Sequence, residues 1–169
     1  MNKKIASLLM AASLMAVAGC AKKETPQDLP PPPVGAEGPT GPAEPVGPAA
    51  GSQADFIANI SSDRIFFDTD KFDVGAEDQA ILTSQAEWLK RYPNVRITIE
   101  GHADERGTRD YNIALGARRA NSAKNALAAL GIDAARISTV SYGKERPEAL
   151  GSTEADWARN RRAVTVTVQ

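Results

Sequence analysis

The sequence predicts an α+β domain in which two helices cover one face of a mixed four-stranded sheet. Residues 95–100 and 163–168 alternate apolar and polar side chains with a period of two, which is typical of half-buried strands. Residues 75–91 and 109–130 instead repeat apolar side chains at helical spacing. Two further short apolar segments, residues 64–67 and 137–142, are the remaining strands and complete the order β-α-β-α-β-β. A two-layer sandwich is the simplest packing for this order.

The first half of the domain is expected to be a strand, a helix and a strand. Residues 64–67 form a short strand that ends at Asp68, and Asp73 can cap the helix that follows. Pro93 stops this helix just before the strand at 95–100. A helix between two strands implies a crossover connection and parallel strands that are neighbours in the sheet.

The second half begins with a polar loop, residues 101–107, which precedes the second helix. Gly131 closes that helix, because glycine accepts the left-handed conformation that ends many helices. A third strand spans 137–142, and residues 144–159 are mostly loop with a helical turn near 154–158. The last strand can pair antiparallel with the third, because a loop of moderate length joins them.

The N-terminus carries the features of a bacterial lipoprotein signal. A basic start precedes an apolar stretch, residues 5–17, that is too short to be a comfortable membrane span. The small residues directly before Cys20 resemble a lipobox, which implies that residues 1–19 are removed and that Cys20 is acylated. Ala21, in place of an aspartate, then favours export to the outer membrane. The alternative is an ordinary secretory signal that ends near a chance cysteine.

Residues 20–52 are expected to form a flexible, proline-rich tether. Nine of the 11 prolines lie between Pro26 and Pro48, and large apolar residues are almost absent. Such a segment cannot bury enough surface to offset its ordering entropy, and proline biases it toward extended polyproline II. Its place between a lipid and a domain favours a leash, although an unstructured tail without mechanical role fits the residues equally well. Residues 53–169 are then the folded domain, which is long enough to bury its own core.

Charge and composition exclude several classes of function. The formal net charge is −1, without the basic excess of a nucleic-acid-binding domain. Cys20 is the single cysteine, so no internal disulfide can form, and one histidine leaves no plausible zinc site. We therefore expect no nucleic-acid partner, no metal and no cofactor, and we expect a monomer.

Polar residues gather at the ends of the strands and at the start of the second helix. The clusters span residues 67–71, 101–107, 111–120 and 160–162. Asp104 and Arg119 can flank a common pocket, because one leaves a strand end and the other a neighbouring helix. A carboxylate beside a guanidinium suits a zwitterionic ligand, since the first binds an ammonium and the second a carboxylate. The alternative is a structural salt bridge between the two side chains. His102 is expected to orient the loop through a hydrogen bond.

These motifs resemble the OmpA-like peptidoglycan-binding domain. The resemblance runs from Ile65 to Val168 and rests on Gly101-His102-Ala103-Asp104, Gly107, Tyr111-Asn112, Leu115, Arg118-Arg119-Ala120 and Asn160-Arg161-Arg162. It implies the fold described above and non-covalent binding of the diaminopimelate residue of the peptidoglycan stem peptide. By the same resemblance, Asp104 would bind the ammonium of that residue and Arg119 its carboxylate. Weaker candidates for the pocket wall are Phe67, Asp68, Asn112, Leu115 and Arg161.

The resemblance also implies a structural role in the cell envelope. A lipid on Cys20 and a bound stem peptide would tether the outer membrane to peptidoglycan, in support of envelope integrity and of outer-membrane invagination during cell division. Periplasmic and inner-membrane Tol proteins would be partners, and a periplasmic propeller protein of that system would compete with the wall.

A peptidoglycan hydrolase is the alternative function. It would use two of Asp68, Asp104 and Glu105 as paired carboxylates, one of them with a raised pKa. The arginines nearby argue against this function, because cations lower carboxyl pKa values. A flagellar stator shares this domain but needs a membrane-spanning helix with a charged residue, and none is expected after Cys20.

Overall fold

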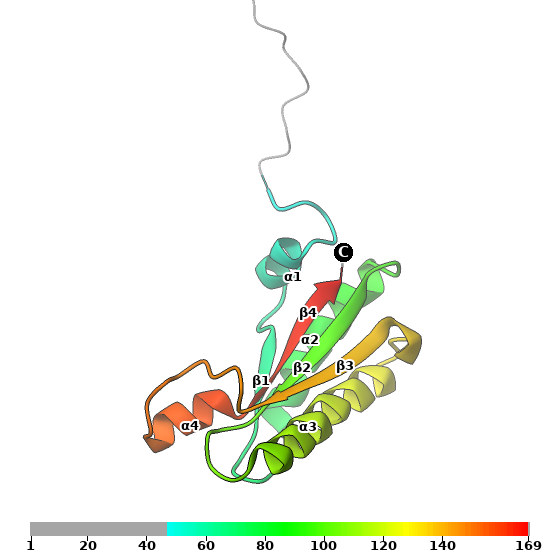
Figure 1. The fold of residues 1–169 in the computed structure, drawn as a ribbon. Helices are drawn as coiled ribbons and strands as arrows, with labels where there is room; N and C mark the ends of the chain where they lie inside the picture. Colours follow the sequence, from blue (N-terminus) through cyan, green and yellow to red (C-terminus); the bar gives the residue numbers. More distant parts are fainter. Residues whose placement is uncertain (1–46, 169) are drawn as a thin grey trace, which may run out of the picture. The chain divides into compact units, whose positions relative to one another are not determined.

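A computed structural model describes residues 47–168 (Figure 1). The predicted leader, Cys20 and the predicted tether up to residue 46 lie outside the described residues. Helices and strands alternate along the described range. They are α1 (Gln53–Asn59), β1 (Arg64–Phe66), α2 (Ala76–Arg91), β2 (Arg96–His102), α3 (Arg109–Ala129), the 3-10 helix η1 (Ala134–Arg136), β3 (Ile137–Gly143), α4 (Glu154–Asn160) and β4 (Arg162–Val168).

The sheet is mixed and four-stranded, which confirms the predicted fold class, but its strand order is β1-β4-β2-β3. β2 and β3 are parallel neighbours, and β4 lies between β1 and β2, antiparallel to both. β1 and β2 are therefore parallel to each other, as the crossover helix implies, but they do not pair. The predicted pairing of the last two strands is wrong, because β2 separates β3 from β4.

β4 has the features of a central strand. Ala163, Thr165 and Thr167 are buried, and Thr165 Oγ1 donates a hydrogen bond of 2.8 Å to Gln85 Oε1 of α2. The segment between β3 and β4 contains α4, which gives it enough length to pass the end of β2 and enter the middle of the sheet (Figure 1). We predicted that β3 and β4 pair because consecutive strands usually do. The long connection between them allows β4 to pair with β1 and β2 instead.

α2 and α3 cover the same face of the sheet, as predicted. One continuous cluster of buried side chains joins both helices to all four strands; it contains Leu82, Ala86, Trp88, Leu89, Ala120, Ala123 and Leu127 from the helices and Ile65, Ile97, Ile99, Ile137 and Ala163 from the strands. No helix within residues 47–168 combines the length and the apolar character needed to cross a membrane.

The backbones of α3 and β2 touch where Gly116 faces Gly101. A Cβ atom added at Gly101 would overlap the carbonyl oxygen of Gly116 and lie 2.6 Å from its carbonyl carbon. A Cβ atom at Gly116 would lie 2.8 Å from the carbonyl oxygen of Gly101. The two glycines therefore set how closely the site-bearing helix approaches the site-bearing strand.

The long helices α2 and α3 end close to the predicted residues, but the N-cap of α2 differs from the prediction. Gly75, not Asp73, is the N-cap of α2, and no side chain caps it. Gly131 follows α3 at φ 93°, and its amide donates a hydrogen bond of 2.9 Å to the carbonyl of Ala128. The amide of Ile132 donates 3.1 Å to the carbonyl of Leu127, which completes a Schellman motif.

α1 was not predicted, because its seven residues bury one large side chain and show no helical period. Phe56 is fully buried, and its ring meets Trp88 edge-on at a centroid distance of 4.9 Å. Asp55 accepts a hydrogen bond from Trp88 Nε1 at 3.2 Å, and Gln53 Oε1 accepts one of 2.7 Å from the amide of Thr167. These contacts hold α1 against α2 and against the C-terminal end of β4.

α4 is longer than the helical turn predicted near residues 154–158. Thr153 and Asp156 form a reciprocal capping box at its start. At its end, buried Asn160 accepts hydrogen bonds from the amides of Glu148 and Ala149 and donates one to the carbonyl of Ala149. α4 and the loop before it are thereby fixed at the edge of the sheet where β4 begins.

His102 lies on the sheet face that α2 and α3 leave open. Its side chain is 2% exposed, and neither ring nitrogen has a hydrogen-bond partner within the described residues. The prediction of a loop-orienting hydrogen bond is therefore wrong. Burial lowers the pKa of His102 to about 4, and the positive charges of Arg162, Arg146 and Arg64 act in the same direction. Glu100 Oε2 lies 3.7 Å from Nε2, beyond hydrogen-bond distance.

We expect His102 to make the domain less stable as the pH falls from 6.5 to 4. Over this range the unfolded imidazole binds a proton and the folded one does not, so the free energy of unfolding decreases. The difference between 6.5 and about 4 corresponds to a loss of roughly 3 kcal/mol at most. Urea unfolding at pH 7 and pH 4 would measure it, and the His102→Asn variant should lose less stability across the same range. Equal losses in the two proteins would contradict the expectation.

Candidate functional site

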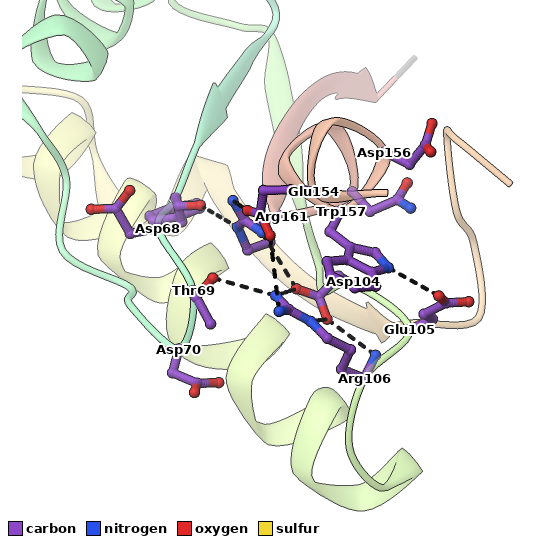
Figure 2. Close-up of polar contacts among 12 residues, drawn as sticks. Asp68, Thr69, Asp70, Asp104, Glu105, Arg106, Glu154, Asp156, Trp157 and Arg161 are labelled. Atoms are coloured by element: carbon purple, nitrogen blue, oxygen red, sulfur yellow. Dashed lines mark hydrogen bonds and ion pairs between the residues drawn. The ribbon is translucent and has the colours of Figure 1, made fainter. Parts of the chain in front are cut away.

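The candidate site lies at the edge of the sheet where β1 and β2 end and β4 begins. β1 and β2 are parallel and β4 is antiparallel to both, so the loop after β1, the loop after β2 and the start of β4 meet at this edge. α3 begins beside it, and α4 packs against it through Glu154 and Trp157 (Figure 2). This arrangement brings together the four polar clusters of the sequence.

Asp104 is the most strongly contacted carboxylate of the site. Its residue is 8% exposed, and both of its oxygens are bound by Arg106: Nη2 donates to Oδ2 at 2.7 Å, and Nε and the backbone amide each donate to Oδ1 at 3.1 Å. Burial would raise the pKa of Asp104, but the hydrogen bonds and charge of Arg106, with the charge of Arg161, outweigh it and leave the pKa below its usual value. Asp104 is therefore ionised at neutral pH.

Arg161 joins the loop after β1 to Asp104 and α4. Nε donates to the carbonyl of Phe67 at 2.9 Å, and Nη2 lies 2.9 Å from Glu154 Oε1. Nη1 lies 3.6 Å from Asp104 Oδ2 without a hydrogen-bond partner in the described residues, although the side chain is only 7% exposed. Figure 2 shows Arg161 between Asp68 and Asp104.

Arg119 lies beneath the site and reaches no solvent. Its guanidinium donates to three backbone carbonyls, those of Lys71 at 2.8 Å, His102 at 2.8 Å and Asp68 at 3.0 Å. Burial, with the charge of Arg161, lowers the pKa of Arg119 to about 10, which still leaves it charged. Within residues 47–168 it forms no ion pair, so the alternative of a direct Asp104–Arg119 salt bridge is wrong. Arg119 instead ties the loop after β1 to the end of β2 through carbonyls.

The predicted site residues divide between two pockets. Asp104, Asn112 and Leu115 line a cavity of about 280 Å³, called here the Asp104 pocket, whose other walls are Thr69, Asp70, Arg106, Gly107 and Tyr111. Phe67, Asp68 and Arg161 line a neighbouring cavity of about 560 Å³, called here the Phe66 pocket, with Phe66, Lys71, Asp73, Val74, Gly75, Asp78, Ala158 and Arg159. Arg119 lines neither pocket.

Several residues of the Asp104 pocket were missed by sequence reasoning. Arg106 is the main one, and its position two residues after Asp104 in a turn was the available signal, because an aspartate often accepts a hydrogen bond from the amide two residues on. Asp70 has a left-handed backbone, φ 57°, and its carboxylate accepts a hydrogen bond of 3.0 Å from the Tyr111 hydroxyl. Asn112 Nδ2 donates 2.7 Å to the carbonyl of Arg106, so this predicted wall residue also holds the loop.

Trp157 lies at the rim of the site. The Arg106 guanidinium stacks 4.2 Å from its ring centroid, and its Nε1 donates 2.9 Å to Glu105 Oε1. Bonds to Glu105 from Ser152 and Trp157 keep the pKa of Glu105 below its usual value. Across residues 47–168, no group of three or more histidine, cysteine, aspartate or glutamate side chains is arranged to hold a metal ion.

The fold is that of a known family of domains. A model of the OmpA family matches residues 66–161, which include all the residues that line both pockets. A crystal structure of the peptidoglycan-associated lipoprotein from Burkholderia pseudomallei is 45% identical and superposes with a TM-score of 0.62, covering 64% of this chain and 92% of that one.

Full-length relatives carry the resemblance beyond the domain. The peptidoglycan-associated lipoprotein of Agrobacterium fabrum is 51% identical over 153 residues, which cover 90% of this chain and 81% of the relative. That of Haemophilus influenzae is 41% identical over 164 residues, covering 97% and 98%. The chain therefore belongs to the OmpA family, and within that family to the peptidoglycan-associated lipoproteins.

Proposed function

We propose that the protein binds the diaminopimelate-containing stem peptide of peptidoglycan without covalent chemistry. The observation that carries this proposal is an ionised, nearly buried Asp104 in the same region of the fold as a buried Arg119, which has no carboxylate partner in the described residues. The names of the relatives, which associate those proteins with peptidoglycan, support the same conclusion.

Asp104 provides the ammonium subsite. In the free protein Arg106 occupies both of its oxygens, and this guanidinium is 38% exposed at the side of the pocket. An arriving ammonium can replace one of these contacts, and Thr69 and Asp70 line the same pocket with further oxygen acceptors. Arg106 is then free to turn toward a carboxylate on the same ligand, which suits a zwitterionic group.

Arg119 provides positive charge for the carboxylate. A guanidinium has five N–H groups, and three of those of Arg119 bind carbonyls, which leaves two. A buried charge without a counter-ion is costly, so a carboxylate that reaches it is strongly stabilised. Because Arg119 is not exposed, direct contact requires a shift of residues 68–71, the loop that carries two of its three acceptors.

The site lacks the electrostatics of a hydrolase. A glycosidase acid needs a carboxyl group with a raised pKa near a second carboxylate. Asp104 and Glu105 both have lowered pKa values, because arginine, serine and tryptophan donors stabilise their ionised forms. These pKa shifts are opposite to the shift that a catalytic acid needs, and they favour ligand binding over acid catalysis.

We further propose an envelope-tethering role for the whole chain. Residues 1–19 would be the leader, residues 20–52 a tether acylated at Cys20, and residues 53–169 the wall-binding domain. The protein would then hold the outer membrane to the wall on its periplasmic face. Tol proteins would be its partners, with consequences for envelope integrity and division.

Binding should depend on the carboxylate of Asp104. Calorimetric titration of the chain from Ala21 onward with a diaminopimelate muropeptide is expected to show binding, and Asp104→Asn should weaken it by about 30-fold or more. A muropeptide with lysine in place of diaminopimelate lacks the second carboxylate and should also bind less well.

Asp110→Asn provides the matched control, because Asp110 is an exposed carboxylate of the first turn of α3 that lines neither pocket. It should change the affinity by less than about twofold. If Asp104→Asn remains folded and binds the muropeptide as tightly as the unmodified chain, Asp104 is not the ammonium ligand and the proposal fails.

A further inference from the structure

The Phe66 pocket is the larger of the two cavities, and binding of a single diaminopimelate group would leave it unused. Its apolar wall comes from β1, the loop before α2 and α4; its members are Phe66, Phe67, Val74 and Ala158. Lys71, Arg159 and Arg161 supply three cations, and Asp68, Asp73 and Asp78 supply three carboxylates. Asp78 is already engaged, because its Oδ1 accepts a hydrogen bond from the amide of Phe66 at 3.1 Å.

Arg161 lines this pocket, and its Nη1 makes no hydrogen bond in the described residues and lies 3.6 Å from Asp104 Oδ2. The residue is 6% exposed, and the other two of its three nitrogens are bound to Phe67 and Glu154. A buried donor without an acceptor costs free energy, so a carboxylate oxygen that reaches Nη1 would be stabilised beyond its contact with an exposed cation.

The two pockets are close enough for one peptide. Arg161 lines the Phe66 pocket and Asp104 lines the Asp104 pocket, and Nη1 of the first lies 3.6 Å from Oδ2 of the second. One residue of an extended peptide spans about 3.3–3.6 Å. A ligand with a zwitterionic group in the Asp104 pocket can therefore place a neighbouring residue in the Phe66 pocket.

The chemistry of the stem peptide matches this second pocket. The residue before diaminopimelate in the stem is a γ-linked D-glutamate with a free α-carboxylate, and the one before that is alanine. We propose that the Phe66 pocket is a second subsite that binds this α-carboxylate, with Arg161 as its fixed donor and Lys71 and Arg159 as exposed donors. Alanine methyl groups would contact the apolar wall. This inference rests on the proposed binding of the stem peptide.

Amidation of the glutamate tests the subsite without altering the protein. Two L-alanyl-γ-D-glutamyl-diaminopimelate tripeptides, one with a free α-carboxylate and one with an α-carboxamide, would be titrated into the chain from Ala21 onward. The free acid should bind about fivefold more tightly, the effect expected for loss of one partly exposed charged hydrogen bond. This preference should decrease in the double variant Lys71→Gln/Arg159→Gln, which loses both exposed donors and retains Arg161.

The double variant Lys90→Gln/Arg96→Gln is the matched control, since it removes the same two charges at the end of α2 and the start of β2, away from both pockets. It should keep the preference for the free acid. Equal affinities of both tripeptides for the unmodified chain would overturn the subsite while leaving the proposed function intact. Binding of neither tripeptide would overturn both.

Discussion

Gly101→Ala is expected to destabilise the domain strongly. The added methyl group would overlap the backbone of Gly116, and no side-chain movement can relieve a clash with a carbonyl group. α3 would have to move away from β2 along the interface that carries Arg119 and the pocket wall. We expect a loss of more than about 4 kcal/mol, a large part of the stability of a domain of this size.

Thermal unfolding followed by circular dichroism would measure this effect as a decrease in Tm of about 10 °C or more. Gly47→Ala is the control, because no heavy atom lies within 4 Å of the Cβ position there. The control should melt within about 2 °C of the unmodified chain. A Gly101→Ala protein that melts as the control does would show that α3 and β2 are not in backbone contact.

Arg119→Met is expected to cost about 3 kcal/mol or more of unfolding free energy. Methionine has a similar length but no donor, so the carbonyls of Asp68, Lys71 and His102 would each lose their hydrogen bond from the guanidinium. A buried acceptor left without a donor costs about 1–3 kcal/mol. Removal of the buried charge offsets part of this loss, which is why the expected total is less than the sum of three such penalties.

Urea unfolding would measure this loss, with Arg118→Met as the control. Arg118 is the preceding residue of α3 and is exposed, with its guanidinium 5.6 Å from the Phe72 ring centroid. The control should change the unfolding free energy by no more than about 0.5 kcal/mol. Similar stabilities of the two variants would mean that the three carbonyl contacts do not hold the loop after β1.

The sequence was sufficient to predict most of the local elements but not the place of β4 in the sheet. Periodicity located α2, α3, β2 and β4 within a few residues, because burial of one face imposes a period on a helix or strand. The place of β4 between β1 and β2 depends on contacts between residues 100 positions apart, such as Arg64 and Val164, which no local pattern records. α1 depends in the same way on the contact of Phe56 with Trp88.

Residue types in the sequence indicated which residues belong to the candidate site. Their hydrogen-bond partners depend on the three-dimensional geometry. Asp104 and Arg119 do not flank a common pocket, contrary to the prediction, because Arg119 is fully buried and lines neither cavity, and each of the two contacts other groups. A guanidinium binds carbonyls as readily as carboxylates when burial brings them within 3 Å, and Arg119 is placed by α3 beside three of them. Arg106, and not Arg119, binds Asp104 because Arg106 lies in the same turn. Distances of this kind follow from the packed backbone and cannot be read from spacing.

The position of α1 determines how a mechanical load would cross the domain. The chain enters at Ser52, at the end of the sheet where β4 finishes, whereas the candidate site lies at the opposite end, where β4 begins. From α1 the covalent path runs along β1 directly into Phe67 and Asp68 of the site. A pull between the segment before Ser52 and a group held at the candidate site would therefore be directed along β1 and would load its hydrogen bonds to β4 in shear, so that they share the force. The same pull would act first on α1, which could detach from Trp88 and lengthen the connection before the sheet yields.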